Sequence, residues 1–463
     1  MNKKIRAKVL VLGGGPGGYV AAIRCGQLGL DTILVDADRL GGTCLIRGCI
    51  PSKAIIHAAA EYEIVRRAID GSPLGVKVTG EASIDLSKMM AWKAGIVDKL
   101  SAGVGALLKR AKVRVEKGWG VFVDAKTCHL KREDGETLVI EAENVVLAAG
   151  SEAVELPILR WNKSIISSTE ALSLPELPKN LAVIGAGYIG LELGTAFRQL
   201  GSNVCFFEAQ GRVLSQYDLG LTAPVEKSLK RLGIEVNLQT SAIAYDGKLL
   251  SGRRADGTIV TAPADKVLVT VGRRPRTTGW GLESMAVDMA GQFIKVDERC
   301  QTSTRGVWAI GDLVGEPMLA HKASAQGEMV AEIIAGNRRQ FKPLVIPAVC
   351  FTNPEVVVVG ENSVDSDDAI TAVFPFSANG RALSMEAGDD GGFVRVIAQK
   401  SDHRILQIAA VGQNVSELSG EMVTLIEMGG RLEDVGDIIH AHPTQSEAIH
   451  EASLRALGHA IHI

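Results

Sequence analysis

Two closely spaced cysteines are the residues best suited to chemistry. Cys44 and Cys49 stand just before an apolar helical pattern. Residues five apart in an ideal helix point about 140° away from each other, so a bond between the two sulfurs needs an irregular helix start. Gly48 and Pro51 can supply it. Lys53 shares a face with Cys49, and a helix N-terminus beside a cation favours the thiolate. The stretch predicts a redox-active dithiol, with two unrelated buried cysteines as the alternative.

A histidine near the C-terminus has a carboxylate close behind it. Between His442 and Glu447, Pro443 can fix a turn that brings the two side chains together. A carboxylate on one ring nitrogen leaves the other free to accept a proton, as in a general base with its orienting partner. Imidazole titrates near neutral pH, which suits proton exchange with a thiol. A structural histidine is the alternative for His442, and His440 stays ambiguous.

These groups need elements to position them, and a nucleotide-binding pattern precedes the dithiol. Its parts in chain order are an apolar strand at 9–12, Gly13, Gly15 and Gly18, a helix at 19–28, a strand at 32–35 and Asp36. The glycines have the GxGxxG spacing, which allows a tight turn, close approach of a diphosphate and packing of helix on strand. The helix N-terminus then faces the phosphates. Asp36 can bond a ribose hydroxyl, although it is shorter than the Glu that is usual there.

The same pattern recurs in the middle of the chain. Its parts are a strand at 181–184, Gly185, Gly187 and Gly190, a helix at 191–200, a strand at 204–207 and Glu208. Two such units predict two dinucleotides, as an enzyme needs that passes hydride between a flavin and a nicotinamide. Glu208 would accept bonds from an adenosine ribose and repel a 2′-phosphate, which favours NAD over NADP. Arg212 keeps the NADP alternative open.

The run from Gly41 to Lys53 resembles the redox signature of the pyridine nucleotide-disulfide oxidoreductase family (class I), which includes glutathione reductase and mercuric reductase. With the two glycine motifs and the histidine motif, the resemblance covers nearly the whole chain. One departure is visible, because the family has Asn and a small aliphatic residue where this chain has Ile46 and Arg47. Two roles are open for Arg47: a cation that lowers the pKa of Cys49, or an exposed residue at the rim of a cleft.

The resemblance implies roles for individual residues. Cys44 and Cys49 would form the redox disulfide, with Cys49 nearer the flavin and Cys44 exchanging with the substrate. Lys53 would stabilise the reduced flavin, and Glu192 would keep Lys53 charged and in place. The other cofactor contacts implied are Gly150, Asp312 and the N–H groups near Ala320 at the flavin, and Gly272 at the nicotinamide.

By the same resemblance, the base works across a dimer interface. His442 and Glu447 of one chain would serve Cys44 and Cys49 of its partner, so an isolated monomer would be inactive.

The predicted fold class is α/β, with two Rossmann-like dinucleotide-binding domains and a C-terminal α+β dimerisation domain. The expected domains are a FAD-binding domain at 1–150, an NAD-binding domain at 151–276, a central domain at 277–346 that returns to the FAD domain, and an interface domain at 347–463. Further helices are expected at 54–69, 86–111, 417–427 and 447–457, and further strands at 113–116 and 120–123 (as a small sheet), 144–150, 267–271, 356–359 and 392–396. His321 is expected to be a structural histidine, and Arg273 and Arg274 a solvated hinge.

The resemblance implies oxidation of dihydrolipoamide carried on a lipoyl domain, with reduction of NAD, beside the acyltransferase core of a 2-oxoacid dehydrogenase complex. Mercuric reductases end in a cysteine pair that residues 457–463 lack, and glutathione reductases prefer NADP. The alternatives are an NADPH-dependent disulfide reductase for another substrate and a flavoprotein that acts mainly as a docking subunit.

Composition bounds the remaining classes. The 463 residues, 46% hydrophobic and 22% charged, suit roughly three or four domains. A net charge of −3 gives no reason to expect a nucleic acid or membrane partner. Short, glycine-interrupted apolar runs predict no membrane span, and no metal site is expected. Seven cysteines do not make a disulfide scaffold, and with no export signal they indicate a cytoplasmic protein.

Overall fold

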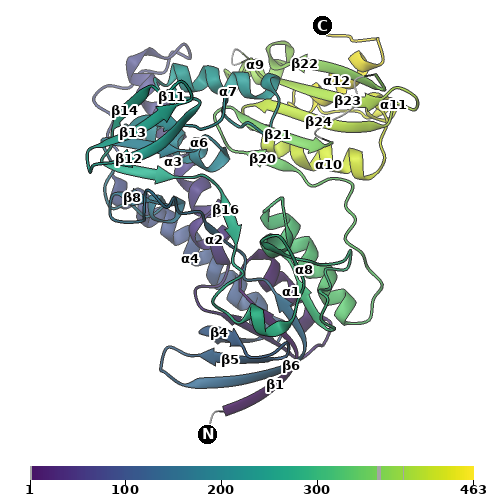
Figure 1. Ribbon diagram of the computed structural model, residues 1–463. Helices are drawn as coiled ribbons and strands as arrows, with labels where there is room; N and C mark the ends of the chain where they lie inside the picture. Colours follow the sequence, from purple (N-terminus) through teal and green to yellow (C-terminus); the bar gives the residue numbers. More distant parts are fainter. Residues whose placement is uncertain (1–2, 362–366, 389–390) are drawn as a thin grey trace.

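A sheet with a parallel centre carries the N-terminal unit in the computed structural model, which describes residues 3–361, 367–388 and 391–463. The sheet order is β3 (Arg114–Lys117), β2 (Thr32–Asp36), β1 (Lys3–Leu12), β6 (Thr137–Leu147), β5 (Thr127–Lys131) and β4 (Trp119–Phe122), with β19 (Val307–Ala309) pairing β6. Val9, Leu10 and Val11 are fully buried, because helices and sheet layers cover both faces of the central strand. This unit forms the lower part of the molecule (Figure 1).

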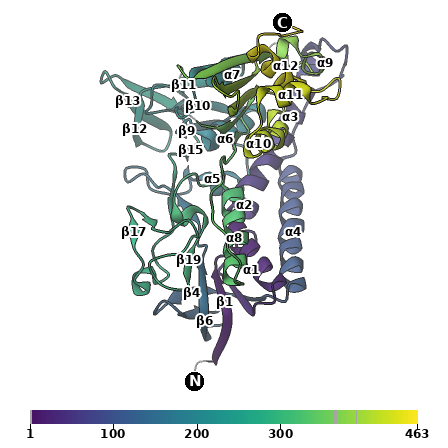
Figure 2. The ribbon, with the colours of Figure 1, turned by 90° about the vertical axis from the view of Figure 1, so that its right-hand side faces the viewer.

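Helices of the N-terminal unit pack on this sheet and carry the dithiol. They are α1 (Pro16–Gln27), α2 (Gly42–Arg47), α3 (Cys49–Gly71), α4 (Leu86–Arg110) and, from later in the chain, α8 (Ala320–Ile334). Contact between α1 and α8 is close, since a Cβ at Gly327 would lie 2.3 Å from the Gly17 carbonyl oxygen. Figure 2 shows α4 running along the side of the molecule. This helix continues unbroken through its glycines at 95, 103 and 105, which interrupt only the spacing of its apolar residues.

The second unit has a parallel sheet of its own. Its order is β11 (Glu235–Asn237), β10 (Asn203–Phe207), β9 (Asn180–Ile184), β15 (Lys266–Val269) and β8 (Ile165–Ile166), accompanied by α5 (Ser168–Ala171), α6 (Tyr188–Gln199) and α7 (Leu219–Arg231). An antiparallel sheet of β12 (Thr240–Tyr245), β13 (Leu249–Arg254) and β14 (Ile259–Pro263) packs beside it. Two crossings of the chain, β7 (Ser151–Ala153) and β16 (Arg273–Pro275), pair as a ribbon between the units.

The C-terminal unit is an antiparallel sheet with helices. The sheet order is β20 (Ala348–Cys350), β21 (Glu355–Gly360), β24 (Ile405–Gly412), β23 (Phe393–Gln399) and β22 (Ala369–Pro375). The helices are α9 (Gly380–Ser384), α10 (Ser419–Glu427), α11 (Leu432–Asp437) and α12 (Glu447–Ala456). Short elements elsewhere are β17 (Met289–Ala290), β18 (Phe293–Ile294) and the 3-10 turns at 282–285, 311–314, 376–378 and 415–418.

The α/β fold class and the C-terminal α+β unit are confirmed, and the differences are local. Residues 113–123 were expected to form a small separate sheet, but β3 joins the main sheet beside β2, and β4 joins through β5. The alternation of apolar and polar residues predicts that these segments are strands, but it does not say with which strands they pair. The sequence patterns also missed α7 and the sheet β12–β14. No helix in the described residues is long and apolar enough to cross a membrane.

Candidate active site

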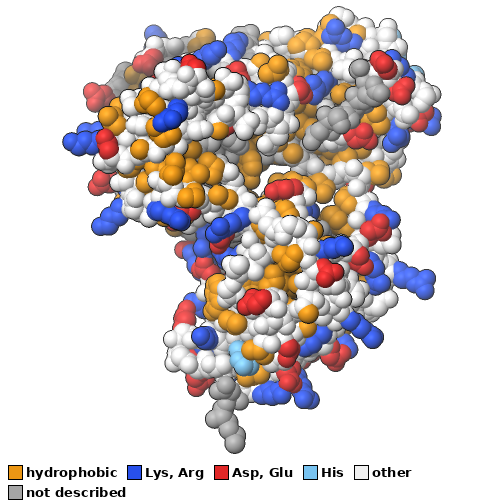
Figure 3. Space-filling model, viewed as in Figure 1, with side chains coloured by type: hydrophobic (Ala, Val, Ile, Leu, Met, Phe, Trp, Pro, Cys, Tyr) orange, Lys and Arg blue, Asp and Glu red, His pale blue; other side chains and the backbone are white. Residues whose placement is uncertain are grey.

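The dithiol, the first glycine loop and Lys53 meet at one cavity. We call it the first cavity, and it lies between the N-terminal and second units. Among its lining residues are Gly13, Gly15, Asp36, Arg47, Cys44, Cys49, Lys53, Gly150, Tyr188, Glu192, Arg276, Asp312 and Ala320. Figure 3 shows the surface hollowed between the upper and lower parts of the molecule. Residues from distant parts of the sequence therefore come together at one cavity.

The irregular helix start at the dithiol lies at Gly48. Helix α2 ends at Arg47, Gly48 adopts φ −145° and ψ −115°, and α3 begins at Cys49. A Cβ at Gly48 would lie 2.8 Å from the Thr43 carbonyl oxygen, so a glycine fits best at this break. Because of this break, Cys44 lies in α2 and Cys49 begins α3, so the two cysteines are not on opposite faces of one helix. Both are free thiols in this structure.

The two thiols differ in acidity. A hydrogen bond from the Cys44 thiol lowers the pKa of Cys49 to about 7, with the Lys53 ammonium acting in the same direction against burial. The same hydrogen bond, together with burial, raises the pKa of Cys44. The reduced pair thus holds one proton on Cys44 and a thiolate at Cys49 near neutral pH.

Lys53 and Glu192 form an ion pair at the wall of the first cavity. The Lys53 Nζ lies 2.7 Å from Glu192 Oε2, and Glu192 is only 4% exposed. The other oxygen, Oε1, accepts the backbone N–H of Phe351 at 2.9 Å. With both carboxylate oxygens bonded, the buried Glu192 holds the ammonium in place.

The glycines fit a dinucleotide at the first cavity. A Cβ at Gly13 would lie 2.3 Å from the Ala148 carbonyl oxygen, and a Cβ at Gly18 would lie 1.8 Å from the Gly13 carbonyl oxygen. Close packing therefore requires glycine at both positions. Gly15 is different, because its Cβ would meet nothing closer than the Gly42 Cα at 3.9 Å. The second glycine therefore leaves space for a ligand in front of the helix N-terminus.

The second glycine motif repeats this arrangement at a second cavity. Gly185 and Gly190 are again required by packing, whereas a Cβ at Gly187 would meet nothing within 4 Å. The lining residues of the second cavity include Gly185, Gly187, Tyr188, Glu208, Tyr217, Thr240, Gly272, Arg273, Met318 and Cys350. Tyr188, Arg273 and Met318 line both cavities, so the two dinucleotide sites adjoin.

The two acidic residues bind their own glycine loops. The Asp36 carboxylate accepts the N–H groups of Gly14 and Asp38, while Glu208 accepts those of Ala186 at 2.6 Å and Gln210 at 2.7 Å. Each acid also lines its cavity, which leaves lone pairs for ribose hydroxyls. Arg212 instead donates to the Ser215 carbonyl oxygen at 2.5 Å.

Asp312 is held by a serine and an arginine that the sequence patterns did not identify. Ser151 donates its hydroxyl to Asp312 at 2.5 Å, and Arg273 Nε donates to Ser151 Oγ at 2.8 Å. Arg273 was predicted to belong to a solvated hinge, and this is wrong: it is half-buried and faces both cavities. Arg274 is exposed and pairs with Glu152 at 2.8 Å. The reason is that β16 alternates its side chains, so the two arginines point to opposite faces.

Arg47 turns away from the cysteines. Its guanidinium forms an ion pair with Asp38, and the side chain is 35% exposed. Both residues line the first cavity close to Asp36. Arg47 therefore connects the dithiol segment to the loop that follows β2. Neither of the two roles considered from the sequence included this contact.

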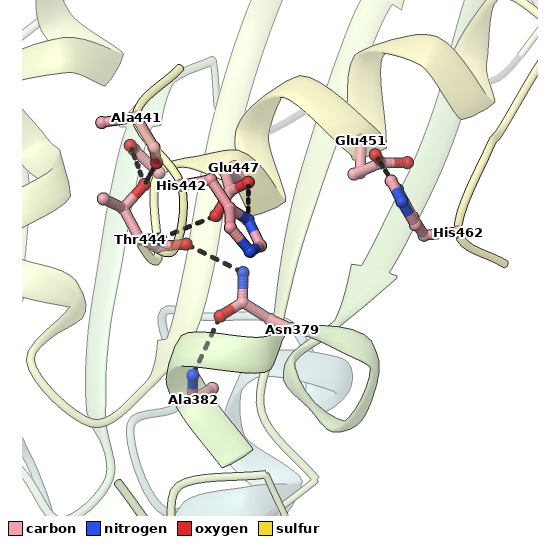
Figure 4. A network of polar contacts seen from close by, with 9 residues as sticks. Asn379, Ala382, Ala441, His442, Thr444, Glu447, Glu451 and His462 are labelled. Carbon is pink, nitrogen blue, oxygen red and sulfur yellow. Dashed lines mark hydrogen bonds and ion pairs between the residues drawn. The ribbon is translucent and has the colours of Figure 1, made fainter. Parts of the chain in front are cut away.

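His442 and Glu447 meet as predicted, at the start of α12 (Figure 4). His442 Nδ1 lies 2.9 Å from Glu447 Oε1, and the Thr444 N–H donates to Glu447 Oε2 at 2.7 Å. Against burial, these two contacts hold the pKa of Glu447 below its usual range. The His442 side chain is 79% exposed. Asn379 supports the turn by donating to the Thr444 carbonyl oxygen at 3.0 Å.

Two further histidines bond within the chain, His440 through a buried side chain and His321 from an exposed position. His440 is 7% exposed and pairs with Glu421 at 2.8 Å, which makes it a structural residue in this chain. His321, at the start of α8, bonds the Pro347 carbonyl oxygen at 3.0 Å, and burial lowers its pKa. Ala320, beside it, is the first residue of α8 and places its N–H at the first cavity.

Comparisons with known proteins agree with this geometry. Residues 7–327 match the family described as pyridine nucleotide-disulphide oxidoreductase, and residues 346–453 match the dimerisation domain of that family. A dihydrolipoyl dehydrogenase of Pseudomonas aeruginosa is 54% identical, with 100% of each chain covered. One from Geobacillus stearothermophilus is 43% identical over 99% of this chain and 98% of that protein.

Solved structures show the same architecture. LpdA from Mycobacterium tuberculosis superposes with a TM-score of 0.88 at 26% identity, covering 98% of this chain and 99% of that one. The flavoprotein disulfide reductase RclA from Escherichia coli, at 22% identity and 96% and 99% coverage, has a TM-score of 0.84 and shares the fold.

Proposed function

The chain belongs to the pyridine nucleotide-disulphide oxidoreductase family, and on this premise we propose how its residues carry out the oxidation of dihydrolipoamide. It is an FAD-containing oxidoreductase that reduces NAD to NADH, as a homodimer in a 2-oxoacid dehydrogenase complex. The identity to dihydrolipoyl dehydrogenases extends over the full length of the chain. The observation that carries the assignment of roles is the first cavity, where the dithiol and the Lys53–Glu192 pair face one dinucleotide site.

FAD bound in the first cavity supplies the electron acceptor for the dithiol and the donor for NAD. Gly15 and the start of α1 leave room for its diphosphate, while Asp36, Gly150, Asp312 and Ala320 line the same space. NAD is expected at the second cavity, lined by Gly187, Glu208 and Gly272.

The protein's own residues handle the thiols and the protons. A substrate thiol gives its proton to Nε2 of a histidine and attacks Cys44, which breaks the Cys44–Cys49 disulfide and leaves a thiolate on Cys49. The second substrate thiol then displaces Cys44, so lipoamide leaves oxidised and the dithiol is reduced. Lys53 stabilises the Cys49 thiolate, and the Cys44 hydrogen bond does so more strongly.

We assign the base to His442 of the partner subunit. Among the described residues, those lining the first cavity extend no further along the chain than Ala323, so His442 of the same chain is not one of them. Its side chain is 79% exposed, and Glu447 holds Nδ1, which leaves Nε2 as the nitrogen for proton transfer. An exposed, oriented imidazole in a dimerisation domain is well placed to serve a second subunit.

We propose the domain division 1–150, 151–276, 277–346 and 347–463. The β7–β16 ribbon lies near both ends of the second segment and supports the first two boundaries, and the pairing of β19 with β6 supports the return of the third segment to the first. A cytoplasmic location is proposed because all seven cysteines are free and five lie apart from the dithiol.

A two-substrate assay tests the reaction. We expect rapid reduction of NAD by dihydrolipoamide and little oxidation of NADPH by oxidised glutathione. Cys49→Ser should reduce the first rate by about three orders of magnitude or more while flavin stays bound. Activity confined to NADPH and glutathione would contradict the proposal in favour of the other disulfide reductases. If Cys49→Ser still reduced NAD rapidly with dihydrolipoamide, the dithiol would have no part in the mechanism.

A further inference from the structure

Phe351 contacts the Lys53–Glu192 pair from the C-terminal unit. It directly follows β20, and its backbone N–H donates to Glu192 Oε1 at 2.9 Å. The Lys53 Nζ lies 4.4 Å from the centroid of the Phe351 ring. One residue therefore holds the carboxylate by its backbone and the ammonium by its aromatic face.

The geometry leaves the ammonium between two attractive groups. Glu192 Oε2 lies 2.7 Å away, and the ammonium also lies over the negative face of the Phe351 ring, 4.4 Å from its centroid. The Lys53 side chain is 32% exposed, so part of its hydration is lost and the ring contact is stronger than at an open surface. Phe351 is itself half-buried, which restricts its freedom to turn away.

The position of this ammonium matters to the dithiol. Lys53 lowers the pKa of Cys49, whereas Glu192 raises it, and the effect of Lys53 depends on how close its ammonium is held to the Cys49 sulfur. A lysine has a flexible four-carbon stem, so Glu192 alone leaves the ammonium free to swing about one contact. A second contact from Phe351 removes that freedom.

We propose that Phe351 is a positioning residue that holds the Lys53 ammonium between Glu192 and Cys49. It thereby makes the C-terminal unit of the same chain part of the dithiol site, besides the role of its histidine toward the partner. The inference rests on the proposed function only in taking Cys49 as the thiolate beside the flavin. A residue that merely packed here would act through size and not through the charge distribution of its ring.

The test separates these two roles at constant shape. Pentafluorophenylalanine placed at position 351 keeps the ring but reverses its charge distribution, and Phe351→Leu removes the ring. In the reduced flavoprotein, the long-wavelength flavin absorption that accompanies a neighbouring thiolate is followed against pH. Both changes should move its midpoint upward by about 0.5 pH unit, because the ammonium is held less firmly near Cys49.

Two matched variants complete the design. Phe351→Tyr keeps an electron-rich ring and should restore the wild-type midpoint. Phe341→Leu, which shortens a partly buried phenylalanine packed in the N-terminal unit, should leave it unchanged. An unshifted midpoint with pentafluorophenylalanine would overturn the proposal, even if Phe351→Leu fails to fold. The titration needs no dihydrolipoamide turnover, so its outcome is independent of the substrate assay.

Discussion

At the residue scale, the site depends on which charge faces which sulfur. Cys49 has a thiol neighbour and an ammonium, and these bring its pKa down to about 7. Burial alone has the opposite effect on the isolated cysteines, raising the pKa of Cys25 and of Cys128 to about 12. The reactive pair therefore differs from the structural thiols both in its local contacts and in its exposure, since Cys25 and Cys128 are fully buried and Cys49 is exposed.

The titration of Cys49 follows from these contacts. Because its pKa is depressed from 9.0 to about 7, the thiolate is present above pH 7 and is lost as the pH falls below it. We expect the long-wavelength absorption of the reduced flavoprotein to fade on acidification with a midpoint near that value. A midpoint that stays above pH 8 would mean that the Cys44 hydrogen bond does not form.

Arg47→Val should leave this midpoint unchanged. The guanidinium pairs with Asp38, and the contacts that lower the pKa of Cys49 come from Cys44, Lys53 and the backbone. The same spectroscopic titration measures it, with wild type in parallel. An upward shift in the valine variant would instead restore the idea that Arg47 acts on Cys49 directly.

At the element scale, the two glycine turns divide their residues between packing and binding. In each turn, the first and third glycines prevent a clash with backbone, and the middle one leaves open space. The break at Gly48 likewise separates α2 from α3 and sets the relation of the two cysteines. The glycine turns and the break thus depend on residues at which a side chain would clash with the backbone.

Gly15→Ala and Gly18→Ala should fail in different ways. The Gly15 backbone has φ −74°, so alanine is tolerated there and the protein keeps its thermal stability. Its methyl group obstructs the diphosphate, weakening flavin binding roughly ten- to hundredfold. In Gly18→Ala the new Cβ would lie 1.8 Å from a carbonyl oxygen, so the melting temperature should fall sharply. Thermal unfolding and flavin release on dilution measure the two effects, and equal behaviour of both variants would contradict this division.

At the scale of the whole molecule, the proposed reaction centre draws on two chains. One chain brings together the dithiol, the Lys53–Glu192 pair and two adjoining cavities, but its exposed His442 belongs to another surface. In the proposed arrangement, the dimerisation domain supplies the base in addition to associating the subunits.

Complementation between two inactive subunits tests this arrangement. A heterodimer of one Cys49→Ser chain and one His442→Ala chain contains one intact centre if the histidine serves the partner. Purified through two different affinity tags, it should show roughly half of the wild-type activity per dimer. If dithiol and base came from the same chain, both centres would be defective and the heterodimer would be inactive. The two mutant homodimers are the controls.

The sequence by itself determined the chemistry and the repeated nucleotide-binding units. Cys44 and Cys49, the two glycine motifs and the His442–Glu447 pair are local patterns, and local spacing fixes them before any long-range contact forms. Only the tertiary structure decided which distant residues join them. Phe351, Ser151 and Arg273 reach the site through loop and strand ends, and Arg47 turns toward Asp38. These contacts depend on how separate units pack, and neither periodicity nor spacing along the chain encodes that packing.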